Sequence, residues 1–320
     1  MRAKSQQFFI LQQSYIQLGE QSMLDFNKIK TYPIKERKNL ESILNFSKLD
    51  DSYVKIENPD MDKLASAVVS AYKNKKQVIA MCGGHVVKTG QTPYLIDLMK
   101  RGVITHVAVN GAFSVHDFEI ALIGETSEDV ANALSDGSFG MAEETGRLMN
   151  EAIKEGAAEG IGYGKAVGRK IDKLDCHYMD YSVLWNAYTL GIPATVHAAI
   201  GTDIIHQHPS CDGAALGKAS YDDFKIFTES VSKLEEGVCI NIGCAVIMPE
   251  VFLKAISISR NLSYKTDKIT TANLDQIDHY RPRENVVNRP TSLGGKGYVI
   301  IGKHHRTIPT LYHGVLKEIQ

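Results

Sequence analysis

The chain has 320 residues, of which 43% are hydrophobic and 23% are charged, and its formal net charge is −1. Such a composition is typical of a globular protein, and the length suffices for one large α/β domain or two smaller ones. The near-neutral charge does not suggest a strongly basic protein that binds nucleic acid or an anionic membrane, so neither partner is predicted.

The five cysteines argue against a disulfide or cysteine-zinc framework. Their number is odd and no pair has C-x-x-C spacing, which favours a reducing cytoplasm. The most apolar stretch near the N-terminus, residues 8–11, is too short for a signal-peptide core or a membrane span. We therefore expect a cytoplasmic protein.

Residues 1–60 differ from the rest of the chain and are expected to form an N-terminal extension and arm. Residues 1–22 are rich in Gln and Ser, and residues 24–51 are basic, polar and broken by Pro33. Five apolar residues could dock this arm on the body: Ile34, Leu40, Ile43, Leu44 and Phe46. No linker or composition break divides residues 61–320, so we predict one domain there.

Strands and helices alternate through that domain. Apolar runs at residues 78–82 and 103–109 flank a helical pattern at 92–101, which predicts a βαβ unit. Further strands are predicted at residues 194–200, 238–242, 268–272 and 298–301. Helices are predicted at residues 61–74, 115–123, 127–134, 139–169, 182–190, 221–233, 249–259 and 307–319. This order predicts an α/β fold with a doubly wound, mostly parallel, Rossmann-like sheet.

Gly162, Gly164 and Gly168 resemble a variant of the dinucleotide fingerprint. No strand precedes them, so we interpret them as glycines that allow close helix packing.

Polar residues gather where the predicted strands end, and a parallel sheet would bring them to one edge. Ligands bind at that edge in open α/β sheets, because glycine lets the backbone approach and helix N-termini face an anion. The pattern predicts a nucleotide or phosphate cradle, although ordinary strand-to-helix turns explain it equally well. The residues concerned include Lys88, Thr89, Gly90, Asn110, Gly111, His197, Asp203, Gly243, Thr271 and Ala272.

His116, Asp117 and Glu119 form a candidate acid/base group, since two carboxylates beside an imidazole can shift one another's pKa. Asp117 could instead cap a helix while Glu119 faces solvent. A second histidine-rich stretch contains His197, Asp203, His206 and His208, whose imidazoles and carboxylate suit zinc or iron. Its spacing matches no metal motif, which favours hydrogen-bonded histidines.

Two basic features precede the last strand. Arg281, Arg283 and Arg289 could grip a carboxylate or phosphate, or hold a neighbouring subunit. Lys296 follows two glycines. A lysine that is desolvated in a crevice can lose its proton and form a Schiff base. The alternative is that Lys296 is an exposed loop lysine without a role in catalysis.

From Val78 onward the order of these motifs resembles the deoxyhypusine synthase family and its homospermidine synthase relatives. The likeness lies in Lys88-Thr89-Gly90, in residues 109–119, in Ile192-Pro193 through Asp203, in residues 243–246, in Thr271-Ala272 and in Lys296. The region around His116 and Asp117 also looks distantly like the C-terminal domain of bifunctional arginine dihydrolase/ornithine cyclodeaminase.

The resemblance implies NAD at the strand ends of a homotetramer, oxidation of an amine such as spermidine, and transfer of an aminoalkyl group through a lysine imine to an acceptor amine. It places Lys296 as that lysine, Asp117 or Glu119 as base, and His116 or His197 beside the substrate. The NAD contacts would come from Lys88, Thr89, Gly90, Asn110, Gly111, Asp203, Gly243, Thr271 and Ala272. The partner would be a small amine or related polar metabolite, and a protein lysine is an acceptor by resemblance only.

The chain also departs from the family, with Leu293, Gly294 and Gly295 where a tryptophan precedes the lysine, and Pro249-Glu250 in place of a histidine pair. Two other functions therefore stay open. One is a metal-dependent hydrolase or lyase that uses the His197, Asp203, His206 and His208 cluster. The other is a non-catalytic, oligomeric nucleotide-binding protein.

Overall fold

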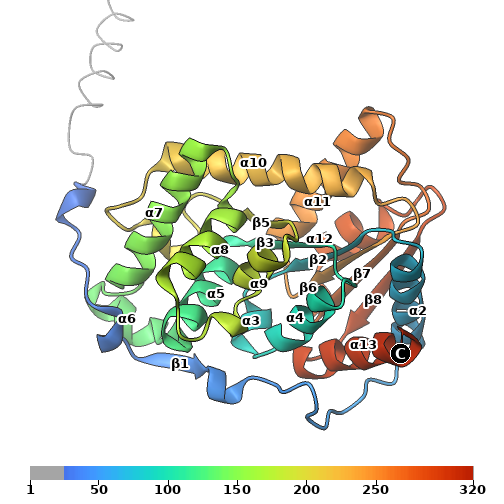
Figure 1. Cartoon of the computed structure of the whole chain (residues 1–320), viewed down its shortest axis with the longest axis horizontal. Coiled ribbons are helices and arrows are strands. Elements are labelled where there is room, and N and C mark those ends of the chain that lie inside the picture. Colours follow the sequence, from blue (N-terminus) through green and yellow to red (C-terminus); the bar gives the residue numbers. More distant parts are fainter. Residues whose placement is uncertain (1–24, 320) are drawn as a thin grey trace, which may run out of the picture.

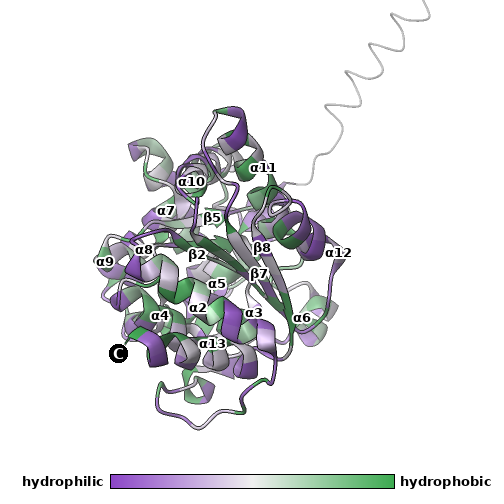
Figure 2. Cartoon of the chain, turned by 90° about the vertical axis from the view of Figure 1, so that its right-hand side faces the viewer, coloured by the Kyte–Doolittle hydropathy of each residue, from purple (hydrophilic) through white to green (hydrophobic). Residues whose placement is uncertain are grey.

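A computed structural model describes residues 25–319, so the predicted extension at residues 1–22 lies outside the described part. The chain from residue 59 onward forms a central parallel sheet with helices on both faces (Figures 1 and 2). No helix among the described residues is long and apolar enough to cross a membrane.

Six strands form the sheet, in the order β5-β3-β2-β6-β7-β8, and every neighbouring pair is parallel. Their bounds are β2 (Val78–Cys82), β3 (His106–Asn110), β5 (Ala194–His197), β6 (Val238–Ile242), β7 (Thr270–Asp275) and β8 (Lys296–Ile301). Counted along the chain, this is the order 3-2-1-4-5-6 of the Rossmann fold. The predicted fold class is confirmed.

Both faces of the sheet are apolar, as expected for buried parallel strands. Along β2, Val78, Ala80 and Cys82 point to one face while Ile79 and Met81 point to the other. The first face packs on α2 (Pro59–Lys73), α4 (Thr92–Lys100), α5 (Gly111–Ile123), α8 (Tyr163–Leu174), α9 (Val183–Leu190) and α13 (His304–Ile319). The second packs on α10 (Gly213–Ser232), α11 (Ile247–Asn261) and the π-helix η6 (Arg283–Asn288).

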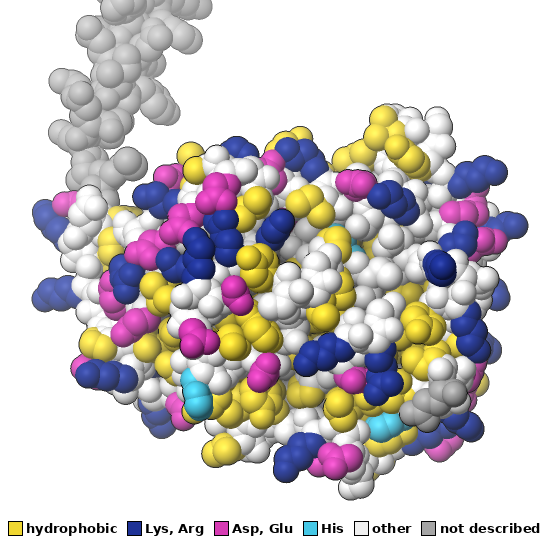
Figure 3. Space-filling view, in the orientation of Figure 1, with side chains coloured by type: hydrophobic (Ala, Val, Ile, Leu, Met, Phe, Trp, Pro, Cys, Tyr) yellow, Lys and Arg dark blue, Asp and Glu magenta, His cyan; other side chains and the backbone are white. Residues whose placement is uncertain are grey.

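Glycines let helix α8 approach the sheet and its neighbours closely. A Cβ on Gly164 would stand 2.2 Å from the carbonyl oxygen of Ala194, and one on Gly168 would stand 2.5 Å from that of Leu184. The interpretation of this motif as helix-packing glycines is confirmed. Beside α8, α7 (Glu143–Glu159) carries a charged outer face (Figure 3), where Arg147 and Lys170 pair with glutamates of α7.

The arm lies along the body and enters its structure at two places. Strand β1 (Asn39–Ser42) pairs antiparallel with β4 (Glu125–Glu128), and Ile34 and Phe46 are buried. Leu40 and Leu44, two of the other expected docking residues, are exposed instead. The arm also includes three short 3-10 helices at Phe26–Lys28, Ile34–Glu36 and Ile43–Asn45.

Several predicted elements differ from the structure. The single helix predicted at residues 139–169 is two helices, α7 and α8, the helix predicted at 221–233 begins at Gly213, and the strand predicted at 194–200 ends at His197. Residues 126–128 form β4 rather than the start of a helix, so α6 spans only Val130–Asp136. Strand β7 begins and ends later than predicted, which moves its carboxyl end to Asp275. The arginine-rich loop is helical, with α12 at Tyr280–Pro282 before η6, and Arg283 pairs with Asp278. The remaining short helices are α3 (His85–Lys88), η4 (Met179–Tyr181) and η5 (Ile204–His206).

Candidate functional site

The order of the strands reverses between β2 and β6, and two glycine turns meet there. A Cβ on Gly83 would stand 2.1 Å from the carbonyl oxygen of Gly243, and the Gly83 N–H donates to the carbonyl of Ile242 at 2.9 Å. Gly243 has a φ of +63°, which L side chains rarely adopt. The two turns can therefore lie this close only because both positions are glycine.

A crevice with a cavity volume of about 360 Å³ opens above these turns. Its walls come from the carboxyl ends of β2, β3 and β6, and from the start of α11, which has no side-chain N-cap. The residues lining this crevice are Gly84, His85, Lys88, Asn110, Ala112, His116, Gly243, Cys244, Ala245, Val246 and Ile247.

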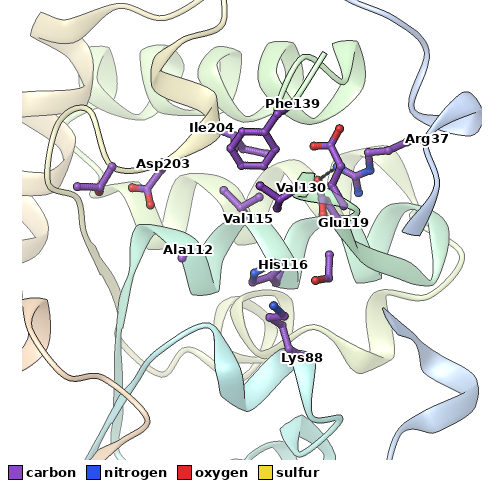
Figure 4. A pocket seen from close by; sticks show the side chains of 13 residues that line it. Arg37, Lys88, Ala112, Val115, His116, Glu119, Val130, Phe139, Asp203 and Ile204 are labelled. Carbon is purple, nitrogen blue, oxygen red and sulfur yellow. Dashed lines mark hydrogen bonds and ion pairs between the residues drawn. The ribbon is translucent and has the colours of Figure 1, made fainter. Parts of the chain in front are cut away.

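A smaller side pocket of about 220 Å³ adjoins the crevice (Figure 4). Lys88, Ala112 and His116 line both spaces. Besides these three, the side pocket is lined by Arg37, Val115, Glu119, Ser127, Glu128, Val130, Phe139, Thr202, Asp203 and Ile204. Its walls thus come from the arm, helix α5, the β4–α6 segment and the turn after β5.

A chain of hydrogen bonds joins the arm to His116 across this pocket. Arg37 Nη1 donates to Glu119 Oε1 at 2.6 Å, Thr126 Oγ1 donates to Glu119 Oε2 at 2.6 Å, and His116 Nδ1 lies 2.8 Å from Thr126 Oγ1. Burial alone would raise the pKa of Glu119, but the hydrogen bond and charge of Arg37 hold that pKa below its ordinary value. Glu119 is therefore an ionised, buried acceptor.

This arrangement fixes the tautomer of His116. An ionised carboxylate only accepts, so the single hydroxyl proton of Thr126 goes to Glu119. His116 Nδ1 must then carry a proton and donate it to Thr126 Oγ1, which leaves the lone pair on Nε2. Burial lowers the pKa of His116 to about 4, so the ring is neutral at physiological pH.

Lys88 lies beside His116 at the wall shared by the two cavities (Figure 4). Among the described residues no carboxylate lies within ion-pair distance of its ammonium, and none forms a hydrogen bond with it. A half-buried lysine without a partner in a cavity is free to meet a ligand.

Asp203 faces Gly111 at the opposite wall of the side pocket. A Cβ on Gly111 would stand 1.8 Å from Asp203 Oδ2, so only glycine leaves room for this carboxylate. Oδ2 is buried and without a hydrogen-bond partner, and burial raises the pKa of Asp203 to about 6. A carboxylate with these properties suits proton transfer near neutral pH.

Two predicted catalytic residues lie elsewhere. Asp117 caps helix α9, since its carboxylate accepts from Ser182 Oγ at 2.6 Å, Val183 N at 2.7 Å and Leu184 N at 3.1 Å. His197 is buried against Phe227 and lies 3.0 Å from Thr195 Oγ1, and burial lowers its pKa to about 3. The candidate acid/base group predicted from the sequence was His116, Asp117 and Glu119. Of these three residues, His116 and Glu119 line the side pocket and Asp117 does not.

Lys296 lies far from the crevice of its own chain. It is the exposed first residue of β8, whereas the crevice lies at the carboxyl ends of the strands. A six-residue strand spans roughly 17 Å at about 3.3 Å per residue, so Lys296 stands at the opposite edge of the sheet.

The predicted NAD contacts divide into two groups. Lys88, Asn110 and Gly243 line the crevice, and Gly111 and Asp203 face each other beside it. Thr271 and Ala272 are buried inside β7, because this strand ends later than predicted. Thr89 caps α3, and Gly90, with a φ of +67°, packs on Phe46 of the arm.

The four residues of the predicted metal cluster do not converge. His206 Nδ1 accepts from the backbone of Gly201 and Asp203, and His208 Nε2 lies 3.2 Å from Glu143. Within residues 25–319 no group of three or more His, Cys, Asp or Glu side chains is arranged to hold a metal ion.

Sequence patterns missed Arg37, Thr126 and His304. Arg37 belongs to the predicted arm, and Thr126 directly precedes the helix predicted at residues 127–134. His304 begins α13 and reaches Gly243, where a Cβ would stand 2.7 Å from its Nε2. Residues 39–42, Asn-Leu-Glu-Ser, carry no strand pattern, so no signal in the sequence linked the arm to this pocket.

No family model matches the chain, and no curated protein matches it. Solved structures do share its fold. AgrE, solved as a ternary complex with ornithine and NAD+, has a TM-score of 0.53 and 12% identity, with 83% of this chain and 34% of AgrE covered. A provisionally assigned LOR/SDH protein from Methanococcus maripaludis S2 has a TM-score of 0.51 and 17% identity, with 84% and 74% covered.

A provisionally assigned deoxyhypusine synthase from Entamoeba histolytica covers 90% of this chain and 97% of its own length, with a TM-score of 0.47 and 9% identity. The chain spans about a third of the length of AgrE and of the cyanobacterial arginine dihydrolase ArgZ. At these identities the similarity to AgrE and the LOR/SDH protein shows the shared fold alone.

Proposed function

We propose that this chain is an NAD-dependent enzyme that oxidises a small amine. The observation that carries the proposal is the pair of joined cavities: a crevice at the reversal point of a Rossmann sheet shares Lys88, Ala112 and His116 with a side pocket that is lined by both charged and apolar side chains. Dinucleotides bind at this reversal point in Rossmann folds. The ornithine and NAD+ in AgrE, which shares the fold, support the same pairing of ligands.

The residues of the crevice fit a dinucleotide. Gly84 and Gly243 have no side chain, so a ligand can approach the backbone there, and Asn110 offers a polar side chain. Val246 is the N-cap of the 15-residue helix α11, which starts at Ile247. The G-x-G-x-x-G fingerprint is absent after β2, so the glycine turn and helix start after β6 would hold the phosphates. NAD bound there would accept a hydride from a substrate in the side pocket.

The residues of the side pocket can prepare an amine for this oxidation. Asp203 accepts a proton from the substrate ammonium, and His116 Nε2 accepts a hydrogen bond from the resulting amine and orients its nitrogen. The carbon–hydrogen bond next to that nitrogen then breaks and its electron pair leaves with the hydride. The substrate would be left as an iminium, NAD would supply the hydride acceptor, and the proton held by Asp203 would pass to solvent.

Calorimetric titration with NAD, followed by NADH absorbance with ornithine, 1,4-diaminobutane and spermidine as probes, tests the proposal. Ala245→Asp places a negative charge at the start of α11 inside the crevice, and we expect it to weaken NAD binding at least about tenfold. Ala214→Asp makes the same change at the exposed start of α10 and should leave binding unchanged.

No NAD binding by the unaltered protein would overturn the proposal. NAD binding without NADH formation from any of the amines would favour the non-catalytic nucleotide-binding function instead. If Ala245→Asp and Ala214→Asp changed the affinity for NAD equally, NAD would bind outside the crevice.

A further inference from the structure

A third cavity lies at the edge of the sheet, apart from the crevice and the side pocket. Its volume is about 610 Å³, which exceeds the volumes of the other two spaces and falls within the range of about 300 to 1,000 Å³ for ligand pockets. Its walls come from α8, α9, α10 and the amino end of the edge strand β5 (Figure 1). It shares no lining residue with the other two spaces, so it offers a separate place for a ligand.

Asp223, on α10, lines this cavity with one carboxyl oxygen in use and one without a partner. Oδ2 accepts from the backbone N–H groups of Gly164 at 2.8 Å and Val196 at 2.7 Å, which ties α10 to the start of α8 and to β5. Oδ1 is buried and has no hydrogen-bond partner. A Cβ on Gly162 would stand 1.6 Å from Oδ1, so only glycine leaves room for this oxygen. The structural role of Asp223 therefore uses Oδ2 and leaves Oδ1 to be explained.

Burial determines the kind of partner that Oδ1 requires. It raises the pKa of Asp223 to about 8, so the carboxyl group is mostly protonated at physiological pH. Because Oδ2 already accepts two hydrogen bonds, the proton lies on Oδ1, which is then a donor without an acceptor. A ligand that supplies an acceptor to such a buried donor gains affinity.

Lys165 is the other charged residue that lines the cavity. It is exposed, so it lies where the cavity opens to solvent. Within residues 25–319 no carboxylate lies within ion-pair distance of its ammonium, since the ion pairs of α8 are made by other residues. The neighbouring Asp222 pairs with Lys218 and Lys225 and does not line the cavity. An O–H donor and a cation are thus left for a ligand, and both favour a carboxylate over an ammonium group.

We propose that this cavity binds an apolar monocarboxylate, with its carboxylate toward Asp223 and Lys165 and its hydrocarbon part against α9. The apolar wall on that side includes Leu184, Ala187 and Ile192. The site does not depend on the proposed function, because none of its residues lines the crevice or the side pocket.

Three probes with the same phenyl group test the proposal by calorimetry. 4-Phenylbutanoate and 4-phenylbutanamide differ only in the charged group, and 4-phenylbutylamine carries an ammonium group in its place. We expect the carboxylate to bind about 10- to 100-fold more tightly than the amide, the value of a hydrogen bond to a charged group, and the amine to bind most weakly. A crystal structure with 4-phenylbutanoate should show its carboxylate within hydrogen-bond distance of Asp223 Oδ1.

Two pairs of variants locate the site. Ile226→Trp places an indole in the cavity wall, and Ile258→Trp makes the same change on α11, at a residue that is also 37% exposed. We expect the first to abolish binding of 4-phenylbutanoate and the second to leave it unchanged. Lys165→Met should weaken binding of the carboxylate about threefold to fivefold, as for an exposed ion pair, without affecting the amide. Lys154→Met, at an exposed position of α7, is the control for the loss of a lysine charge.

Thermal melting of each variant establishes that it folds. The inference would be overturned if 4-phenylbutanoate did not bind, or if the amide or the amine bound as tightly. Unchanged affinity in Ile226→Trp or in Lys165→Met would do the same, as would a crystal structure with the carboxylate away from Asp223.

Discussion

Burial gives the two titratable groups at the centre of the side pocket different protonation behaviour. His116 has its pKa lowered to about 4 and stays neutral, with Nε2 as an acceptor. Asp203 has its pKa raised to about 6 and exchanges its proton close to physiological pH. Pairs of groups that the protein moves away from their ordinary pKa in this way are typical of catalytic sites.

The proposed base therefore predicts an acidic limb in the pH profile. As the pH falls through about 6, Asp203 takes up a proton and can no longer accept one from the substrate, so kcat/KM should fall about tenfold per pH unit below that value. Above it the carboxylate is ionised and the limb ends. Asp203→Asn should lower kcat by about 100-fold or more, within the range for loss of a general base.

Steady-state kinetics of the unaltered protein and of Asp203→Asn, measured between about pH 5 and pH 8, tests for the acidic limb and for the loss of kcat. This is the range in which groups near neutral pH titrate. An Asp203→Asn enzyme with full activity and the same acidic limb would show that another group is the base. Unchanged NAD binding in this variant is the control that the crevice is intact.

Strand β4 is the element that assembles the side pocket, because it connects the arm to helix α5. It pairs with β1 through Asn39 and Glu128, and it supplies Thr126, which joins His116 to Glu119. Periodicity along residues 125–128 could not reveal this strand. Its four residues are polar, and their pairing partner lies more than 80 residues away, in a segment expected to be an arm.

Thr126→Val tests the hydrogen-bond chain that joins His116 to Glu119 through Thr126. The change removes the hydroxyl and leaves the His116 Nδ1–H and one Glu119 oxygen without partners, at a cost of about 1–3 kcal/mol each. We expect kcat to fall by about 10- to 100-fold, as for other groups that orient an imidazole, while NAD affinity is retained. Thr126→Ser keeps the hydroxyl and should restore most of the activity.

The nitrogen chemical shifts of His116 provide a readout that a loss of stability would not produce. Thr126→Ser should give the Nδ1–H tautomer, and Thr126→Val a mixture of the two tautomers. A valine variant with normal kcat and an unchanged tautomer would contradict the assigned hydrogen-bond chain.

At the scale of the whole molecule, the sequence pattern was sufficient to predict the sheet and the edge that carries the site. The alternation of apolar runs and helices predicted parallel strands, and Lys88, Asn110 and Gly243 do line one crevice. The pattern could not show the order of the strands, which depends on long-range packing. It could not place Asp117 either, since only the tertiary structure brings Ser182 and the start of α9 to that carboxylate.

The direction of the strands also separates the two lysines that could act in the reaction. Lys88 follows the carboxyl end of β2 and lines both cavities, whereas Lys296 begins β8 at the other edge. The family resemblance assigned the reactive amine to Lys296 because that lysine follows glycines and precedes a strand. The position of a residue in the sequence order of motifs does not establish which edge of the sheet it occupies.

Lys296→Ala therefore tests whether one chain holds the complete site. Lys296 is exposed, and exposed substitutions usually change free energies by no more than about 0.5 kcal/mol, so kcat/KM should stay within roughly twofold. Lys88→Met, assayed beside it with the same amine, should lower kcat/KM strongly. A large loss in Lys296→Ala with normal folding would mean that Lys296 reaches a crevice other than that of its own chain. Mixing Lys296→Ala with an inactive Asp203→Asn protein would then restore activity only if one chain supplies its lysine to the other.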